Sequence, residues 1–233
     1  MKNRLIRISP SILCIDYNDD IVLKLALDKI EQSGAHMVHL DVMDGKFVPN
    51  KTFDHKLVDK IKDMTSLMLD VHLMVENPHS VINDYAKAGA DLITVHYEAY
   101  EDCDKIEDTL KLIKSKNVLA GVAISPKTPA LKLKDLLKTG LVDVVTVMGV
   151  NPGASGQTII PGSAEKVAEI REMDKRVYIQ IDGGVTLKNV SILRRMGANI
   201  IVSSKAIFEA KNMKKAIKTL KGGGFINRIF EDI

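Results

Sequence analysis

The sequence HLDVMDG (residues 39–45) places polar side chains at alternate positions of an otherwise apolar run. Because side chains alternate between the two faces of a strand, His39, Asp41 and Met43 would project to one face. The sequence DVHLM (residues 70–74) repeats this arrangement. A buried imidazole or carboxylate without a partner costs several kcal/mol. The two stretches therefore predict neighbouring strands that share an inward-facing partner, most simply a metal ion.

Short β-branched runs alternate with charged amphipathic segments along the whole chain. Strands are expected over residues 5–9, 37–41, 68–72, 92–96, 119–124, 142–148, 177–182 and 200–203. Helices are expected over residues 21–33, 55–64, 81–88, 104–115, 131–138, 163–173, 187–196 and 213–220. Eight such units predict an α/β fold, a single TIM (β/α)8 barrel over residues 1–233, with 222–233 as a possible C-terminal tail. The alternative is a doubly wound open sheet, but no GxGxxG turn follows residues 5–9.

Helix 21–33 is expected to pack through a stripe formed by Ile21, Leu25 and Ile30. Glycines at positions 34, 89 and 197 follow three of the predicted helices and indicate their C-terminal ends.

Composition narrows the class of protein. The 233 residues are 45% hydrophobic, and 33 basic and 30 acidic residues leave a formal charge of +3. This balance, without a dense basic patch, argues against nucleic-acid binding. The two cysteines form no disulfide framework, and no apolar run approaches the roughly 20 residues of a membrane span. Without a signal-peptide pattern at its start, the chain is expected to be a cytoplasmic protein, and barrel enzymes commonly form homo-oligomers.

Functional groups of TIM barrels gather at the carboxyl ends of the strands. His39, Asp41, His72 and Asp182 all fall at such ends, and two imidazoles with two carboxylates suit one divalent metal ion, Zn²⁺, Mn²⁺ or Fe²⁺. Each alone is more commonly an ordinary hydrogen-bonded residue, but four at equivalent positions favour a metal site.

Small residues follow the last three strands, where these barrels bind phosphate. Their backbone N–H groups can approach an anion closely. The candidate phosphate and substrate residues are Gly153, Ala154, Ser155, Gly156, Gly183, Gly184, Ser204 and Lys205. Met43, Met74 and Met148, also at strand ends, would form an apolar bed for the substrate, although methionine is more often a core residue.

Several motifs together resemble the ribulose-phosphate 3-epimerase family. They are SPSIL (9–13), HLDVMDGKFVPN (39–50), DVHLMVENP (70–78), VMGVNPG (147–153) and IDGGV (181–185). The resemblance implies a divalent ion held by His39, Asp41, His72 and Asp182. It also implies that Asp41 and Asp182 are the catalytic acid/base pair, that Ser11, His39 and His72 contact the substrate, and that the glycine loops hold its phosphate. The implied reaction interconverts D-ribulose 5-phosphate and D-xylulose 5-phosphate through an enediolate.

The chain departs from the family pattern at three places. Gly-Ala-Ser-Gly (153–156) replaces Gly-Phe-Gly-Gly, and Ser204-Lys205 replaces Gly-Ser after the eighth strand. Cys14-Ile15-Asp16 is closer to the allulose-6-phosphate 3-epimerase branch. These departures keep D-allulose 6-phosphate open as an alternative substrate.

Two other classes compete with an epimerase. A barrel decarboxylase would carry Asp-x-Lys-x-x-Asp, whereas here Met43 stands at the lysine position between Asp41 and Asp44. A Schiff-base aldolase needs a lysine at a strand end, and residues 142–148 contain none. A barrel that only binds a phosphorylated metabolite would not need an acid/base pair.

Overall fold

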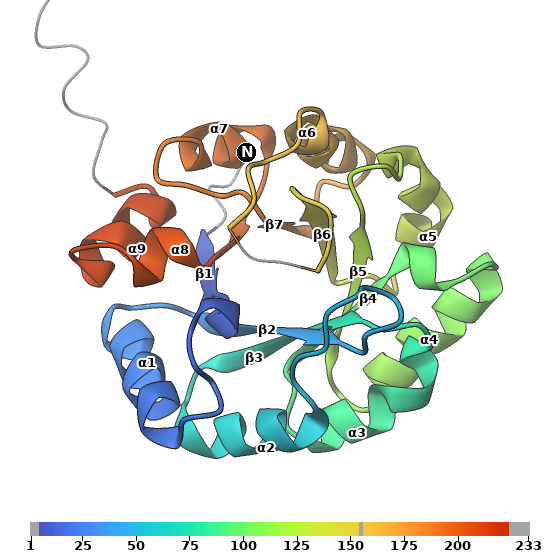
Figure 1. Cartoon of the computed structure of the whole chain (residues 1–233). Helices are drawn as coiled ribbons and strands as arrows, with labels where there is room; N and C mark the ends of the chain where they lie inside the picture. The colour runs from blue at the N-terminus through green and yellow to red at the C-terminus, as the bar shows by residue number, and fades with distance from the viewer. Residues whose placement is uncertain (1–4, 154–155, 224–233) are drawn as a thin grey trace, which may run out of the picture.

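The computed structural model describes residues 5–153 and 156–223, and within them eight parallel strands form a nearly closed barrel surrounded by helices (Figure 1). The strands are β1 (Arg7–Pro10), β2 (Met37–Met43), β3 (Met68–Met74), β4 (Leu92–His96), β5 (Leu119–Ile124), β6 (Val144–Met148), β7 (Tyr178–Asp182) and β8 (Ile200–Ser203). Their order, β1-β8-β7-β6-β5-β4-β3-β2, brings the first and second strands to opposite ends of the sheet. A bridge between Ser11 and His39 joins these ends. The predicted TIM barrel is confirmed.

The helices follow the strands in the predicted alternation, with two differences. They are α1 (Asp20–Gln32), α2 (His55–Met64), α3 (Ile82–Lys87), α4 (Cys103–Ser115), α5 (Lys134–Lys138), α6 (Ser163–Met173), α7 (Val190–Met196), α8 (Lys205–Phe208) and α9 (Met213–Lys221), with short 3₁₀ turns η1 (Ile12–Cys14), η2 (Pro78–Val81), η3 (Tyr97–Ala99) and η4 (Ala130–Leu133). The predicted helix 131–138 is divided between η4 and α5, and α8 was not predicted. Of the predicted tail 222–233, Gly222 ends α9, and residues 224–233 lie outside the described part of the chain.

Helix ends follow the expected local chemistry. The Asp19 carboxylate accepts hydrogen bonds from the N–H groups of Ile21 and Val22 and so begins α1. Asn212 accepts one from Lys215 and begins α9. The glycines at 34, 89 and 197 all adopt positive φ, as predicted for helix ends.

The buried face of α1 includes Ile30, as predicted, but not Ile21 or Leu25. Ile21 and Leu25 are 72% and 52% exposed, whereas Leu23, Leu27 and Ile30 are fully buried. Both sets of residues include an i, i+4 pair, so periodicity alone could not choose between them. In the structure Leu23 and Leu27 belong to the main core cluster.

The barrel interior is divided along its axis into an apolar end and a polar end. At the amino ends of the strands Met37, Leu92, Val144 and Ile200 pack together as one cluster. Toward the carboxyl ends the inward positions become polar and remain buried, namely Ser9, His39, Asp70, His72, Thr94, His96, Thr146 and Gln180. The larger apolar core lies outside the sheet, between the strands and the helices. Buried polar groups need partners, so this polar end is the part of the fold that requires a chemical explanation.

No helix in the described part of the chain is long and apolar enough to cross a membrane.

Candidate functional site

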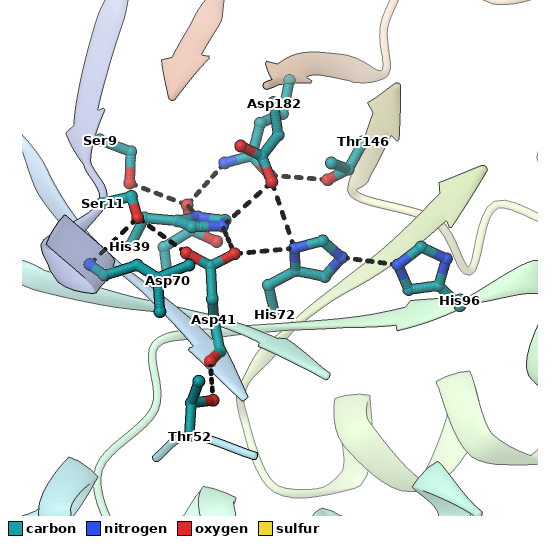
Figure 2. Close-up of polar contacts among 12 residues, drawn as sticks. Ser9, Ser11, His39, Asp41, Thr52, Asp70, His72, His96, Thr146 and Asp182 are labelled. Carbon is teal, nitrogen blue, oxygen red and sulfur yellow. Dashed lines mark hydrogen bonds and ion pairs between the residues drawn. The ribbon is translucent and has the colours of Figure 1, made fainter. Parts of the chain in front are cut away.

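Four side chains from three strands converge at the polar end of the barrel (Figure 2). His39 and Asp41 come from β2, His72 from β3 and Asp182 from β7, and one potential ligand atom from each lies within 4.8 Å of all the others. We call this set the four-residue centre. Nε2 of His39 lies 3.4 Å from Oδ1 of Asp41 and 3.4 Å from Oδ2 of Asp182. Nδ1 of His72 lies 3.7 Å and 3.4 Å from the same two oxygens.

The geometry of the four-residue centre fits a bound cation. Among the described residues, Nε2 of His39 and Nδ1 of His72 are buried and make no hydrogen bond. Both nitrogens face carboxylate oxygens, which is the donor set that Zn²⁺ and similar ions take. Ligands about 2.1 Å from a tetrahedral ion are separated by about 3.4 Å, close to the four separations given above. These residues could therefore hold a divalent metal ion, as the sequence predicts.

The electrostatics of the four-residue centre reflect close packing of opposite charges. Burial lowers the pKa of His39, but the carboxylates of Asp70, Asp41 and Asp182 outweigh it and raise this pKa well above its usual value. Burial raises the pKa of Asp41, but His39 and His72 hold it well below its usual range. The pKa of Asp182 is lowered for the same reasons. Without a metal ion, protons on the imidazoles balance the carboxylates, and a cation would replace those protons.

Asp70 orients His39 from behind. Its Oδ2 lies 2.8 Å from Nδ1 of His39 and accepts further hydrogen bonds from the Ser9 hydroxyl, at 2.8 Å, and the Gln180 amide, at 2.5 Å. Since a carboxylate only accepts, Nδ1 of His39 carries a proton, and Nε2 is the nitrogen that faces the centre and would offer its lone pair to a bound ion. Asp70 lies on the inward face of β3, as predicted. Its hydrogen bond to His39 was not predicted.

The second oxygen of Asp41 is held by Ser11. The Ser11 hydroxyl donates a hydrogen bond of 2.7 Å to Oδ2 of Asp41 within the buried end of the barrel. Ser11 is also the residue that bridges to His39 where the barrel closes. The hydroxyl of Thr52 donates to the Asp41 carbonyl and accepts from the Met43 N–H. Ser11 thus both helps to close the barrel and orients Asp41.

A cavity of about 650 Å³ opens above the four-residue centre. The predicted site residues that line it are Ser11, Asp41, Met43, Met74, Met148, Gly153, Gly156, Asp182, Gly183, Gly184, Ser204 and Lys205. His39 and His72 are fully buried beneath it. Ala154 and Ser155 lie outside the described residues. The volume is in the usual range for small-molecule sites.

The loops after β6 and β7 meet at one side of the cavity. A Cβ on Gly184, where φ is +70°, would lie 2.4 Å from the backbone nitrogen of Ile159. The two loops therefore touch backbone to backbone, and a side chain here would separate them. Asn50 reaches across from the β2–α2 loop and donates a 2.5 Å hydrogen bond to the Gly153 carbonyl. The glycines thus shape this wall of the cavity.

Lys205 lies against the glycine loop. The side chain starts at the first residue of α8 and passes over Gly156, where a Cβ would lie 2.5 Å from its Cε and 2.6 Å from its Nζ. Lys205 is exposed and lines the cavity. Its ammonium group is thus at the same wall as the two glycine loops.

The three methionines have different surroundings. Met43 and Met74 pack with Val48 in a small apolar cluster, with Leu13 and Phe47 against it. Met148 is buried at the end of β6 and, like the other two, lines the cavity. All three methionines are therefore part of the cavity lining, and their contact with a substrate stays a prediction.

Sequence reasoning missed two polar residues next to the centre, His96 and Glu98. His96 ends β4, so the rule that selected His72 could have found it. It is fully buried, and burial lowers its pKa. Asp44, part of the decarboxylase-like spacing, instead accepts hydrogen bonds from the N–H groups of Lys46, Phe47 and Glu76. It braces the loop after β2 and does not enter the cavity.

Comparisons with known proteins agree with this geometry. Residues 7–208 match the model of the ribulose-phosphate 3 epimerase family. A ribulose-phosphate 3-epimerase of Bacillus subtilis (strain 168) is 38% identical over 94% of this chain and 99% of its own length. The chloroplastic ribulose-5-phosphate-3-epimerase of Arabidopsis thaliana is 39% identical over 92% of this chain and 75% of its own length. Among solved structures, 3-hexulose-6-phosphate synthase from Salmonella typhimurium shares the fold at a TM-score of 0.71 and 14% identity, covering 92% of this chain and 96% of that one.

Proposed function

Because this chain belongs to the ribulose-phosphate 3 epimerase family, we propose that it interconverts D-ribulose 5-phosphate and D-xylulose 5-phosphate. The observation that carries this proposal is the pair Asp41 and Asp182. They line one cavity, come from different strands, and lie on opposite sides of the two imidazoles of the centre (Figure 2).

Inversion at carbon 3 requires removal of a proton from one face of the substrate and delivery of a proton to the other. A single base would return the proton to the face from which it came, so two carboxylates are needed. We assign Asp41 and Asp182 to these two positions. One must be ionised while the other is protonated, and in the reverse direction they exchange roles. Ser11 fixes Asp41 through its 2.7 Å hydrogen bond, so this carboxylate keeps one orientation during proton transfer.

The four-residue centre is proposed to hold one divalent ion, Zn²⁺, Mn²⁺ or Fe²⁺. Such an ion would supply Lewis-acid stabilisation of the negative charge that develops on the substrate oxygens. The support in this chain is the pair of unpartnered imidazole nitrogens facing two carboxylates. His39 and His72 are fully buried beneath the cavity, so bulk water does not reach their rings.

We assign the phosphate of the substrate to the wall formed by Gly153, Gly156, Gly183, Gly184 and Ser204. Backbone N–H groups of small residues can approach an anion there, and Lys205 adds a positive charge at the same wall. Met43, Met74 and Met148 would contact the carbon chain of the sugar.

A longer substrate is the second candidate. The Gly-Ala-Ser-Gly segment lacks a large side chain, and Lys205 replaces a smaller residue of the family pattern. Both changes fall in sequence segments that we assign to phosphate binding, and a hexulose such as D-allulose 6-phosphate carries its phosphate one carbon farther from carbon 3. An aldolase reaction has no support, since β6 has the sequence VVTVM and carries no lysine.

The test is turnover of both sugar phosphates by the metal-loaded protein, followed by identification of the product. We expect a higher kcat/KM with D-ribulose 5-phosphate and D-xylulose 5-phosphate as product. A higher value with D-allulose 6-phosphate would replace the substrate and keep the reaction type. Binding of either compound, seen as a thermal shift, without any turnover would overturn the enzymatic proposal in favour of a binding protein.

A further inference from the structure

A chain of hydrogen bonds leads outward from His72. Nε2 of His72 lies 2.9 Å from Nε2 of His96, and Nδ1 of His96 lies 3.0 Å from Oε2 of Glu98 (Figure 2 shows the first of these contacts). The two rings are stacked with centroids 5.0 Å apart, and Phe47 packs on His96. The proposed epimerase mechanism uses neither His96 nor Glu98.

Glu98 is itself held firmly. Its Oε1 accepts hydrogen bonds from the Ser125 N–H, at 2.7 Å, and from the Thr128 hydroxyl. Burial raises the pKa of Glu98, but the hydrogen bonds from His96, Thr128 and Ser125 outweigh it and lower this pKa to about 2. Nζ of Lys166 in turn donates to the carbonyls of residues 125, 126 and 128, at 3.0, 2.6 and 2.6 Å. The loop after β5 is thus fastened around an ionised carboxylate.

The ionised carboxylate determines where each proton of the chain lies. Glu98 can only accept, so Nδ1 of His96 must donate. A neutral imidazole has one N–H, so Nε2 of His96 is an acceptor and Nε2 of His72 is the donor. From this network we assign the proton-free nitrogen of neutral His72, the form that binds a metal ion, to Nδ1, which is the atom that faces Asp41 and Asp182.

The two imidazoles of the centre are supported differently. Nδ1 of His39 is hydrogen-bonded directly to the carboxylate of Asp70, and its Nε2 faces the centre. His72 presents Nδ1, and a second histidine stands between it and its carboxylate. Partners of this kind orient metal-binding histidines and fix their tautomers.

We propose that His96 and Glu98 are positioning residues that hold His72 as its Nε2–H tautomer and thereby set how tightly the four-residue centre binds a divalent ion. The inference rests on the metal centre of the proposed function. Loss of such outer partners typically costs about 10- to 100-fold in metal affinity.

Glu98→Gln makes the inference testable at a single atom. In this variant the side-chain oxygen keeps the hydrogen bonds from Ser125 and Thr128, so its NH₂ group faces His96. This NH₂ group donates to Nδ1 of His96, which reverses the donor and acceptor of each hydrogen bond between this side chain and His72. Nε2 of His96 then carries the proton, and His72 must move its own proton to Nδ1. His96→Phe keeps the ring packing and removes both hydrogen bonds. Asp143→Asn is the matched control, because Asp143 also braces a strand through a backbone N–H and is 26% exposed against 25% for Glu98.

Zn²⁺ affinity of the metal-free full chain is measured by competition with a chromophoric chelator. Long-range ¹H–¹⁵N spectra of the same metal-free protein, recorded at a pH above the raised pKa of His72, report which nitrogen of the neutral ring carries the proton. We expect about 10- to 100-fold weaker Zn²⁺ binding in Glu98→Gln and His96→Phe, a proton on Nδ1 of His72 in Glu98→Gln, and no change in Asp143→Asn.

The outcomes separate the two proposals because substrate turnover is not part of the readout. If the wild-type chain binds Zn²⁺ and both variants bind it within twofold of wild type, the role of His96 and Glu98 is wrong while the metal centre stands. An unchanged His72 tautomer in Glu98→Gln would also overturn that role. If the wild-type chain binds no Zn²⁺, the metal centre and the positioning role both fail.

Discussion

Lys205 offers a quantitative test of the phosphate assignment. Its Nζ lies over Gly156 at the wall where the glycine loops meet. An ammonium group about 4 Å from a unit negative charge is worth about 4 kcal/mol at an effective dielectric constant of about 20, and about 1 kcal/mol in bulk water. Because Lys205 is exposed, the lower part of this range applies. Lys205→Met should therefore cost about 1–2 kcal/mol, or about 5- to 30-fold in KM for the phosphorylated sugar.

The assay is steady-state epimerisation by Lys205→Met and wild type at low and high salt. We expect KM to rise, kcat to change much less, and the difference to shrink as salt screens the wild-type contact. Lys215→Met, a change at a lysine of α9 that does not line the cavity, is the control and should leave KM unchanged. A KM for Lys205→Met within twofold of wild type at low salt would refute the assignment of Lys205 to the phosphate.

Packing, titration and metal binding give three further predictions. Gly184→Ala should lower Tm by several degrees more than Gly140→Ala. Both glycines have φ near +70°, but only at Gly184 would the added Cβ have a backbone atom within 2.4 Å. Equal decreases in Tm would show that the loops after β6 and β7 can separate. Because its pKa is lowered to about 2, ionised Glu98 adds about 3 kcal/mol to the free energy of unfolding above pH 4.5, and this contribution is lost as the pH falls toward 2. The free energies of unfolding of wild type and Glu98→Gln, measured with urea, should therefore differ less at pH 3 than at pH 5. A difference that stays constant over this range would contradict the prediction. Zn²⁺ affinity should weaken as pH falls, because the raised pKa values of His39 and His72 favour protons on the imidazoles; binding measured by competition that is independent of pH between 8 and 5 would exclude these ligands.

The inner face of the barrel could be predicted because strands have a strict two-residue period. His39 and Asp41 on β2, and Asp70 and His72 on β3, occupy inward positions as the alternation requires. The same period could not reveal that Asp70 supports His39, because that depends on the register between β2 and β3, which pairs His39 with Asp70.

Other features depend on tertiary contacts that the sequence does not encode locally. The face of α1 was mispredicted because two apolar rows compete, and only packing against the sheet selects Leu23 and Leu27. Helix α8 has only four residues, too few for a periodic signal. Lys166 sits in a charged helix that indicates a solvent-facing lysine, yet it is 9% exposed and binds three carbonyls of the loop after β5.

The central claim is that Asp41 and Asp182 transfer protons on opposite faces of carbon 3. The most direct measurement is turnover of D-ribulose 5-phosphate in D₂O by the metal-loaded wild type, Asp41→Asn and Asp182→Asn, with deuterium at carbon 3 followed by NMR. We predict that the product carries solvent deuterium while substrate recovered early does not, and that each variant loses at least about 10²-fold in kcat with an unchanged circular dichroism spectrum. Product that retains the original proton, or near-normal turnover in both variants, would contradict the account.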